Sequence, residues 1–539
     1  MEKSEYIKIS NARDIKDAKE RRIYRLFEIL PGLLSWGTLL GVVFLSWLAP
    51  VFIAFFIIAF DIYWLLKTVF LSVHLRSSFA VIKKISQRNW LAALEEQNKK
   101  QDLSWPASAQ PSHKATDWRG KATVGWQEIY HLVIFPMYEE SYEVVAETFE
   151  SLLSTNYPKE KMIVVLAVEK RAGERARAVA GKIEKYFGGK FFNFLTVVHP
   201  NDIVGELAGK GSNETWAAKE AKEKIIDRLN LPYENIVVSV FDVDTVVYRE
   251  YFGRLTHVFL EAPDRLHCSF QPVPIFNNNI WDAPSFSRVA AQSGTFWHMM
   301  QQERPERLAT FSSHAMNFKT LVEMDWWSVK NVSEDSRIFW QALLFYDAKY
   351  RVVPLFYPVS MDANLAENWW QTAVNVYKQQ RRWGWGVENV PYVLFGFRHN
   401  KNISLKTKIF WMFNHMEGFW SWGTNALLIF LLGWLPLFLG GQQFNVTVLS
   451  YNLPQVTRAI MTAAMIGIVS SAIYGARLLP PRPKHHQPRR YFFMAMQWIL
   501  MPFTIIVFGA IPGLEAQTRL MLGKYMGFWV TPKVRQTKS

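Results

Sequence analysis

The sequence predicts an α/β domain inserted between N-terminal and C-terminal transmembrane helices. Two apolar stretches come first, at 29–48 and 50–73, and three more come last, at 419–440, 456–476 and 490–513. Short β-branched runs alternate with helical patterns in the soluble segment between them. Each apolar stretch is close to the roughly 20 residues that cross a bilayer, and the alternation is typical of a mainly parallel sheet.

The charge pattern favours a membrane partner over nucleic acid. The 539-residue chain has a formal net charge of +15, and much of this charge lies beside the apolar stretches. That arrangement fits anionic lipid headgroups and the positive-inside rule, and none of the usual nucleic-acid motifs is present in the sequence. The single cysteine, Cys268, excludes an internal disulfide framework and a cysteine-based zinc site, and is interpreted as a small buried residue.

The connections between the apolar stretches predict the orientation. The connection at 477–490 carries five Arg and Lys residues and no acid, whereas the connection at 440–455 carries no charge. The positive-inside rule therefore places 477–490, the basic N-terminus and the soluble domain in the cytoplasm. We expect an integral protein of the plasma (inner) membrane, divided as follows: 1–28 basic N-terminus, 29–75 two transmembrane helices, 76–125 interfacial helix and linker, 126–400 catalytic domain, 401–418 interfacial helix, 419–513 transmembrane helices, and 514–539 interfacial segment and tail.

The last apolar stretch presents a topological difficulty. Two spans before the domain and three after it would leave the basic C-terminal tail outside the cell. Pro502 and Pro512 interrupt this stretch, so we consider a re-entrant or in-plane segment as the alternative.

Within the soluble segment, strands are expected at 131–135, 162–166, 194–198 and 236–240, and helices at 141–154, 171–187 and 213–229. In sheets of this kind, ligands bind at the carboxyl ends of the strands. Asp242-Val243-Asp244 follows the fourth expected strand. Two carboxylates at i and i+2 of an extended chain point the same way and can bind a hard divalent cation that in turn holds phosphates, although a lone Asp-x-Asp is more often a solvated turn.

Three further motifs could carry chemistry. Ser333-Glu334-Asp335 precedes a helical stretch, which fits both a helix N-terminus and a catalytic carboxylate. Gly209-Lys210-Gly211-Ser212-Asn213 precedes another helix and fits either a phosphate-binding turn or a surface turn. In the run 379–386, Gln379, Arg382 and Trp383 share one helical face, which fits either a clamp for a diphosphate and a sugar ring or a helix anchored at the lipid interface.

The order of these motifs resembles that of the processive family-2 glycosyltransferases, the cellulose, chitin and hyaluronan synthases. The matching segments, listed in chain order, are Phe135-Pro136-Met137-Tyr138-Glu139-Glu140, Lys210 with Asn213, Asp242-Val243-Asp244, Glu334-Asp335, Gln379-x-x-Arg382-Trp383 and Phe528-Trp529-Val530-Thr531-Pro532-Lys533. The last of these resembles the gating loop of cellulose synthases. The resemblance covers nearly the whole chain, and it implies a glycosyltransferase A-type, Rossmann-like domain that depends on Mg²⁺ or Mn²⁺.

The resemblance also implies the roles of individual residues. They are Asp335 with Glu334 as catalytic residues; Tyr138, Glu140, Glu169, Lys210, Asn213, Asp242, Gln379, Arg382, Thr531 and Lys533 for the nucleotide-sugar; Trp383 and His314 for the acceptor; and Asp242 and Asp244 for the metal. Two of these positions depart from the family pattern. Glu169 stands where the family has an aspartate near the uracil, and His314 lies in a degraded acceptor-site motif, where a structural histidine is the alternative.

The expected function is transfer of a sugar from a UDP-sugar to a growing polysaccharide, with inversion at the anomeric carbon and coupling to secretion through the membrane. One alternative is a single transfer to a lipid carrier or glycolipid. The other is a transport or scaffold subunit with an inactive transferase domain, against which the presence of both Asp242/Asp244 and Asp335 argues.

Overall fold

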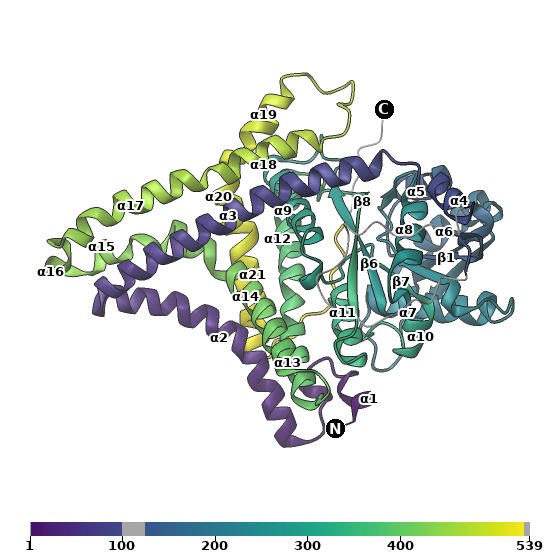
Figure 1. The fold of residues 1–539 in the computed structure, drawn as a ribbon, viewed down its shortest axis with the longest axis horizontal. Coiled ribbons are helices and arrows are strands. Elements are labelled where there is room, and N and C mark those ends of the chain that lie inside the picture. The colour runs from purple at the N-terminus through teal and green to yellow at the C-terminus, as the bar shows by residue number, and fades with distance from the viewer. Residues whose placement is uncertain (1, 100–123, 533–539) are drawn as a thin grey trace.

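The computed structural model describes residues 2–99 and 124–532. The soluble domain lies at one end of the molecule and the long apolar helices extend from it to the other end (Figure 1). Part of the predicted linker, 100–123, and the tail residues 533–539, including Lys533, lie outside the described residues. The predicted architecture, an α/β domain between N-terminal and C-terminal apolar helices, is confirmed.

A single sheet of eight strands forms the centre of the domain, in the order β3-β2-β1-β4-β7-β6-β8-β5. The strand bounds are β1 Tyr130–Met137, β2 Met162–Glu169, β3 Asn193–His199, β4 Ile236–Val240, β5 Val246–Val247, β6 Cys268–Phe276, β7 Ala315–Asn317 and β8 Arg351–Met361. The first four contain the strands expected from the sequence.

The first four strands form a parallel half with the order 3-2-1-4. β1 pairs with β2 from His131↔Met162 and with β4 from Tyr130↔Ile236, and β2 pairs with β3. Every residue of β2 and β4 is buried, as expected of strands covered on both faces. The strand order reverses between β1 and β4, and ligands bind at such a switch point in open α/β sheets.

The other half of the sheet is mixed in direction, but β6 and β8 run the same way as β1 to β4, so the sheet is mainly parallel, as expected. β7 is antiparallel to both β4 and β6, β6 and β8 run parallel with an irregularity between Gln271 and Val273, and the short β5 is antiparallel to β8.

The helices of the soluble domain follow the expected alternation. The bounds are α4 Trp90–Lys99, α5 Tyr142–Ser154, α6 Gly173–Phe187, α7 Lys210–Ala221, α8 Tyr251–Glu261, α9 Ser285–Gln302, α10 Phe318–Glu323, α11 Glu334–Phe345, α12 Trp369–Gly384 and α13 Asn389–His399. α7 begins at Lys210, earlier than expected, and continues into a π-helical turn at Lys222–Ile226.

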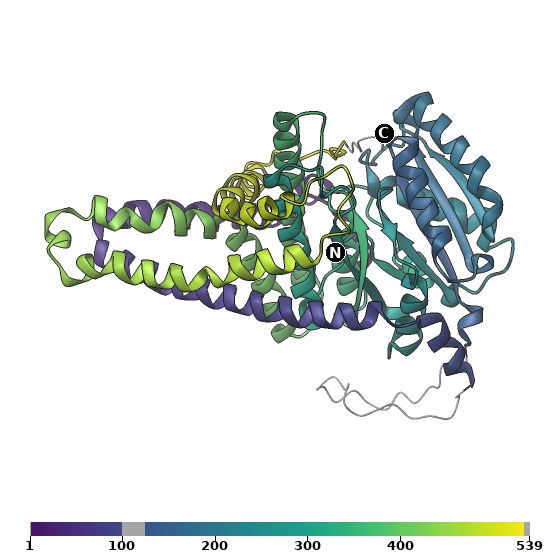
Figure 2. The same cartoon turned by 90° about the horizontal axis from the view of Figure 1, so that it is seen from above.

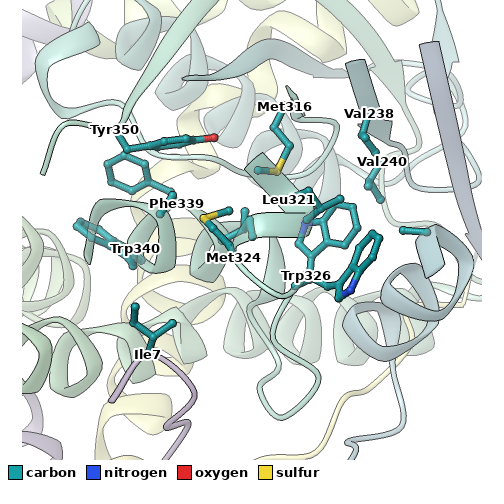
Figure 3. Packing of buried hydrophobic residues seen from close by; sticks show 14 of the residues in the cluster. Ile7, Val238, Val240, Met316, Leu321, Met324, Trp326, Phe339, Trp340 and Tyr350 are labelled. Carbon is teal, nitrogen blue, oxygen red and sulfur yellow. The ribbon is translucent and has the colours of Figure 1, made fainter. Parts of the chain in front are cut away.

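A hydrophobic cluster packs the mixed centre of the sheet against α11. Val238 and Val240 of β4 and Met316 of β7 belong to it together with Phe339 of α11 (Figure 3). Ile7, from the N-terminal segment, lies in the same cluster. The first residues of the chain are therefore part of the core that supports α11.

Four helices are long and apolar enough to cross a membrane, and a bent pair raises the number to five among the described residues. They are α2 Ala18–Leu48, α3 Pro50–Ser86, α17–α18 Val448–Arg477, α19–α21 Arg490–Met521 and the pair α14 Leu405–Phe430 with α15 Leu435–Leu439. α3 extends to Ser86, into the segment where the sequence predicted an interfacial helix, and α4 follows at Trp90–Lys99. Phe44, Trp47 and Phe55 expose more than half of their surface, as expected of lipid-facing side chains.

The last apolar stretch differs from the others in direction. It is divided into α19 Arg490–Met496, α20 Met501–Ile505 and α21 Ile511–Met521, with Pro502 and Pro512 in the first turns of the latter two. α20 and α21 run across the long direction of α3 and α17, as both views show (Figures 1 and 2).

Candidate functional site

Polar side chains lie at the carboxyl ends of the parallel strands β1, β2 and β3. The main-chain N–H of Tyr138, directly after β1, donates to Glu140 Oε2 at 2.7 Å. The Arg171 guanidinium lies 4.8 Å from the centre of the Tyr138 ring and donates to Glu169 Oε2 at 2.5 Å. A cavity of about 30 Å³ beside them is lined by Glu169, Arg171 and His199 at the ends of β2 and β3. The structure therefore brings three residues predicted for the nucleotide-sugar site, Tyr138, Glu140 and Glu169, to the carboxyl edge of the sheet.

Asp242 is held by two partners beyond the end of β4. Lys210 Nζ, at the start of α7, lies 2.9 Å from Asp242 Oδ1, and Ser312 Oγ donates to Asp242 Oδ2 at 2.9 Å. Burial lowers the pKa of Lys210, but the Asp242 and Glu334 carboxylates outweigh it and hold the pKa of Lys210 well above its ordinary value. The ammonium group is therefore charged and sits where a cation is attracted.

Asp244 occupies a different environment from Asp242. The segment is a tight turn, closed by the Thr245 N–H donating to the Asp242 carbonyl at 2.8 Å, which corrects the expectation of an extended chain. Asp244 is almost fully buried, and its Oδ2 accepts a hydrogen bond from the main-chain N–H of Asp362 at 3.1 Å. Asn278 Nδ2 donates to the Asp244 carbonyl at 3.1 Å and to Asp362 Oδ1 at 3.0 Å.

Glu334 and Asp335 form the first turn of α11, so the helix start and the proposed catalytic carboxylate coincide. Lys210 Nζ lies 3.7 Å from Glu334 Oε1. Burial raises the pKa of Glu334 to about 8; the Asp335 carboxylate adds to the effect and Lys210 opposes it. Burial also raises the pKa of Asp335, an effect that Lys210 and Arg382 oppose and the nearby Asp242 strengthens.

α7 and α11 touch at their first turns. A Cβ added at Gly211 would lie 2.8 Å from the Ser328 carbonyl oxygen and 2.9 Å from Glu334 Cβ, closer than real side chains approach. Glu214, one turn further along α7, is completely buried, and burial raises its pKa well above the ordinary value. Neither of its carboxylate oxygens has a hydrogen-bond partner among the described residues. Burial therefore favours the neutral form of Glu214.

α12 and the C-terminal tail close the other side of the site. The Arg382 guanidinium lies 5.0 Å from the centre of the Phe528 ring, and Lys378 Nζ lies 5.4 Å from that of Trp529. A Cβ on Gly209 would meet Phe528 Cγ at 2.7 Å, so the tail lies directly on the start of α7. Thr531 is buried, and its hydroxyl has no partner within the described part of the chain.

Gln379, Arg382 and Trp383 lie on α12, as predicted, and each is partly buried. The Trp383 ring packs against Phe276 at the end of β6, with ring centres 5.9 Å apart. Two further residues of the run 379–386, Arg381 and Trp385, make contacts within the protein. Arg381 pairs with Glu515 of α21 at 2.7 Å, and Trp385 is buried and donates to Glu388 at 2.9 Å.

Two predicted site residues make contacts within the protein. Asn213 Nδ2 donates to the Ala167 carbonyl of β2 at 2.8 Å, which ties α7 to the sheet. His314 is buried; its Nδ1 lies 3.0 Å from the Phe311 carbonyl oxygen, and Trp327 Nε1 donates to its Nε2 at 3.4 Å. Burial lowers the pKa of His314 to about 4. These contacts favour the alternative that His314 is a structural histidine and does not line the acceptor site.

The sequence did not assign a role to Glu214, Ser312 or Asp362. Ser312 was visible only as part of a degraded motif, and Asp362 follows a strand that the pattern did not predict. The sequence offered one signal for the two acids. Burying a carboxylate at an apolar strand end or inside a helix costs free energy, so an acid at such a position is a candidate for a functional role.

The carboxylates present fit a divalent cation. Asp242 and Asp244 offer the hard oxygen ligands that Mg²⁺ and Mn²⁺ prefer, and Asp242 already attracts the Lys210 ammonium at 2.9 Å.

No family model and no curated protein matches this sequence. Solved structures that match include the mannosyltransferase PcManGT from Pyrobaculum calidifontis with GDP-Man and Mn²⁺, at 14% identity, 84% of this chain, 100% of that chain and a TM-score of 0.40. Another is S. aureus TarS with UDP-GlcNAc, at 13% identity, 66% of this chain, 93% of that chain and a TM-score of 0.34. At 14% and 13% identity, these similarities assign no function to this chain.

Proposed function

We propose that the protein is a membrane-integrated inverting glycosyltransferase that moves a sugar from a UDP-sugar to a growing polysaccharide. One observation carries the proposal: Lys210, Asp242, Glu334 and Asp335 meet at the carboxyl edge of the sheet, and Phe528 of the tail packs between the start of α7 and Arg382. A fixed cation, paired carboxylates and a segment that covers them suit a diphosphate leaving group.

The donor would bind along the ends of β1, β2 and β4. Tyr138, with Arg171 behind it, and Glu169 would face the nucleotide base. Lys210 and Arg382 would bind the diphosphate, and Gln379 would lie on the same helical face as Arg382. Glu140 orders the loop after β1 through its bond to the Tyr138 N–H, and Thr531 with Lys533 would cover the bound nucleotide.

Asp242 and Asp244 would hold Mg²⁺ or Mn²⁺, which when bound neutralises charge that develops on the departing diphosphate. Lys210 is then free to leave Asp242 for the diphosphate. Ser312 keeps the second oxygen of Asp242 in place, and the Asp362 N–H does the same for Asp244.

Asp335 would act as the general base. Its carboxylate takes the proton of the acceptor hydroxyl, whose oxygen forms a bond to the anomeric carbon as the bond from that carbon to the UDP oxygen breaks. Attack from the face opposite UDP inverts the configuration. Burial raises the pKa of Asp335, which strengthens it as a base, and the positive charges of Lys210 and Arg382 oppose this rise.

Trp383 would stack on the acceptor sugar. Its ring lies against Phe276 at the end of β6, beside a cluster that contains Met494 of the apolar helix α19, where it can offer an apolar face to C–H groups. This position suits a chain that leaves toward the membrane. We leave His314 out of the acceptor site because both of its ring nitrogens have protein partners.

The direction of α19–α21 supports a tail on the catalytic side of the membrane. α21 is fastened to α12 by Glu515, which accepts from Tyr377 at 2.7 Å and pairs with Arg381 at 2.7 Å. A segment lying across the other helices and fastened to the soluble domain would leave two crossings after the domain, α14–α15 and α17–α18. A tag on the C-terminus should then be protected on the side that contains the soluble domain; an external tag would overturn the assignment of the tail as a cover.

A lipid carrier or glycolipid is the second candidate acceptor, because Trp383 lies beside the cluster that contains Met494 of the apolar helix α19. Purified protein with Mn²⁺ and a panel of UDP-sugars separates the two. Products of many sugars support polysaccharide synthesis, a single low-mass glycolipid supports the second candidate, and no UDP release from any donor would overturn both in favour of a transport or scaffold subunit.

A further inference from the structure

Two histidines and an aspartate from distant parts of the chain meet beside the apolar helices. Asp282 lies in the segment after β6, and His485 and His486 lie in the basic connection between α18 and α19. Each offers one ligand atom, and the three atoms lie within 4.8 Å of one another. His486 Nε2 is 2.8 Å and His485 Nε2 is 3.5 Å from the same oxygen, Asp282 Oδ1.

We propose that Asp282, His485 and His486 bind a Zn²⁺ ion. Two imidazole nitrogens and one carboxylate oxygen are a ligand set that zinc takes in proteins, with water in the fourth position. Mg²⁺ and Mn²⁺ favour all-oxygen ligands, so this site differs in chemistry from Asp242 and Asp244. The proposal does not depend on the proposed function.

A simple ion pair accounts less well for the arrangement. One imidazolium satisfies one carboxylate, as in the surface pair of His267 with Asp264, where Nδ1 lies 3.0 and 2.9 Å from the two oxygens. At Asp282, by contrast, His485 Nε2 also lies near Oδ1, the oxygen that His486 already contacts. Two imidazolium groups this close would repel each other, whereas two neutral rings can share a metal ion.

The surroundings hold the ligands in place. The His486 ring stacks on Trp281 with centres 6.1 Å apart, and Arg482 donates to the His486 carbonyl. Arg490 donates to the Trp281 carbonyl at 2.7 Å. These two guanidinium groups are thus directed at backbone carbonyls, which leaves the carboxylate of Asp282 to the histidines.

The site would fasten the membrane helices to the catalytic domain. Asn277 donates to the Leu478 carbonyl at 3.3 Å, and Trp281 donates to that of Pro480 at 3.2 Å, so the two segments already touch. Asn278, which follows Asn277 in the chain, donates hydrogen bonds to the Asp244 carbonyl and to the Asp362 carboxylate. A zinc ion at Asp282 would therefore fix the position of the segment that supports Asp244.

The test is zinc retention by the full-length protein in detergent. The protein is stripped with a chelator, exchanged into excess Mg²⁺ to occupy the all-oxygen carboxylates, given ZnCl₂, and passed through a gel-filtration column before metal analysis. We expect about one zinc ion per chain. His485→Ala, which changes an exposed side chain, should weaken zinc binding about tenfold or more, and His485→Ala/His486→Ala should abolish it.

His267→Ala is the matched control, because it removes the histidine of an exposed histidine–aspartate pair elsewhere, and it should keep the zinc. Co²⁺ in place of Zn²⁺ should give visible d–d absorption in the parent and not in the double variant. The proposal is overturned if the parent retains no zinc, if the double variant retains as much as the parent, or if zinc is lost from Asp242→Asn/Asp244→Asn and kept by the histidine variants.

Discussion

The two halves of the sheet differ in regularity and in what they bring to the site. In the parallel half, β3-β2-β1-β4, the strand ends carry Tyr138, Glu169 and Asp242, and α7, between β3 and β4, carries Lys210. The mixed half, β7-β6-β8-β5, is accompanied by α11, between β7 and β8, with Asp335, and by α12, after β8, with Arg382 and Trp383. A regular unit thus carries the residues assigned to the donor, and an irregular one carries those assigned to the base and the acceptor.

The halves meet where the first turns of α7 and α11 touch. Lys210 contributes to both, since it lies 2.9 Å from Asp242 and 3.7 Å from Glu334. Neither half alone therefore contains all the residues of the proposed transfer site. Changes in the parallel half should affect donor and metal, changes in the mixed half should affect base and acceptor, and changes at the junction should affect both.

The largest effect of a change in the parallel half is expected for Asp242→Asn. Loss of the carboxylate removes a metal ligand and the partner of Lys210, so turnover should fall about 10²–10³-fold and the Mn²⁺ concentration needed for half activity should rise. UDP release measured against Mn²⁺ concentration checks this. Equal activity of Asp242→Asn and the parent would place the metal elsewhere.

At the junction, Gly211→Ala should destabilise the protein by about 1–3 kcal/mol, because its Cβ would lie 2.8 Å from the Ser328 carbonyl oxygen. Gly181→Ala is the matched control, since Gly181 is also helical and no atom lies within 4 Å of an added Cβ. That change should be neutral or slightly stabilising. Equal thermal stability of the two variants would show that α7 and α11 do not touch as described.

In the mixed half, Trp383→Ala should raise the acceptor concentration for half activity about 3–10-fold, the value of one lost stacking contact, and leave UDP binding unchanged. The exposed Trp370 on the same helix is the control, and Trp370→Ala should change neither. Weaker UDP binding in Trp383→Ala would contradict the division between donor and acceptor residues.

A pH dependence of stability is also expected at the junction. Burial raises the pKa of Glu334 from 4.5 to about 8, so the folded protein binds more protons than the unfolded chain between these values. The contribution to stability is complete below pH 4.5 and is lost as the pH rises through about 8. In metal-free protein, unfolding free energy should fall over this window by up to about 1.4 kcal/mol per pH unit. Glu334→Gln should show a flatter profile, and an unchanged slope would contradict the assignment.

The sequence predicted the parallel half and not the mixed one for a physical reason. β1, β2 and β4 are continuous apolar runs buried on both faces, which is a strong signal. β6 and β8 each contain two prolines. Proline cannot donate a hydrogen bond to a neighbouring strand, so its presence in a sequence predicts an edge strand or a loop and not a central strand. β5 has only two residues and no detectable pattern.

Motif order located most of the site, but contacts between distant segments could not be predicted. Ser312 reaches Asp242, and Asp362 reaches Asp244, only because the mixed strands place their ends beside β4. The early start of α7 was missed because two glycines flank Lys210 and read as a turn. In the fold, Gly211 provides the space for Glu334.

The claim that both halves form one transfer site is tested most directly with Asp335→Asn. UDP binding in the presence of Mn²⁺ is measured by calorimetry, and sugar transfer is measured on the same preparation. The account predicts UDP affinity close to that of the parent and a fall in transfer of about 10²–10⁴-fold, because the parallel half is intact and the base is lost. Transfer as fast as in the parent would contradict it.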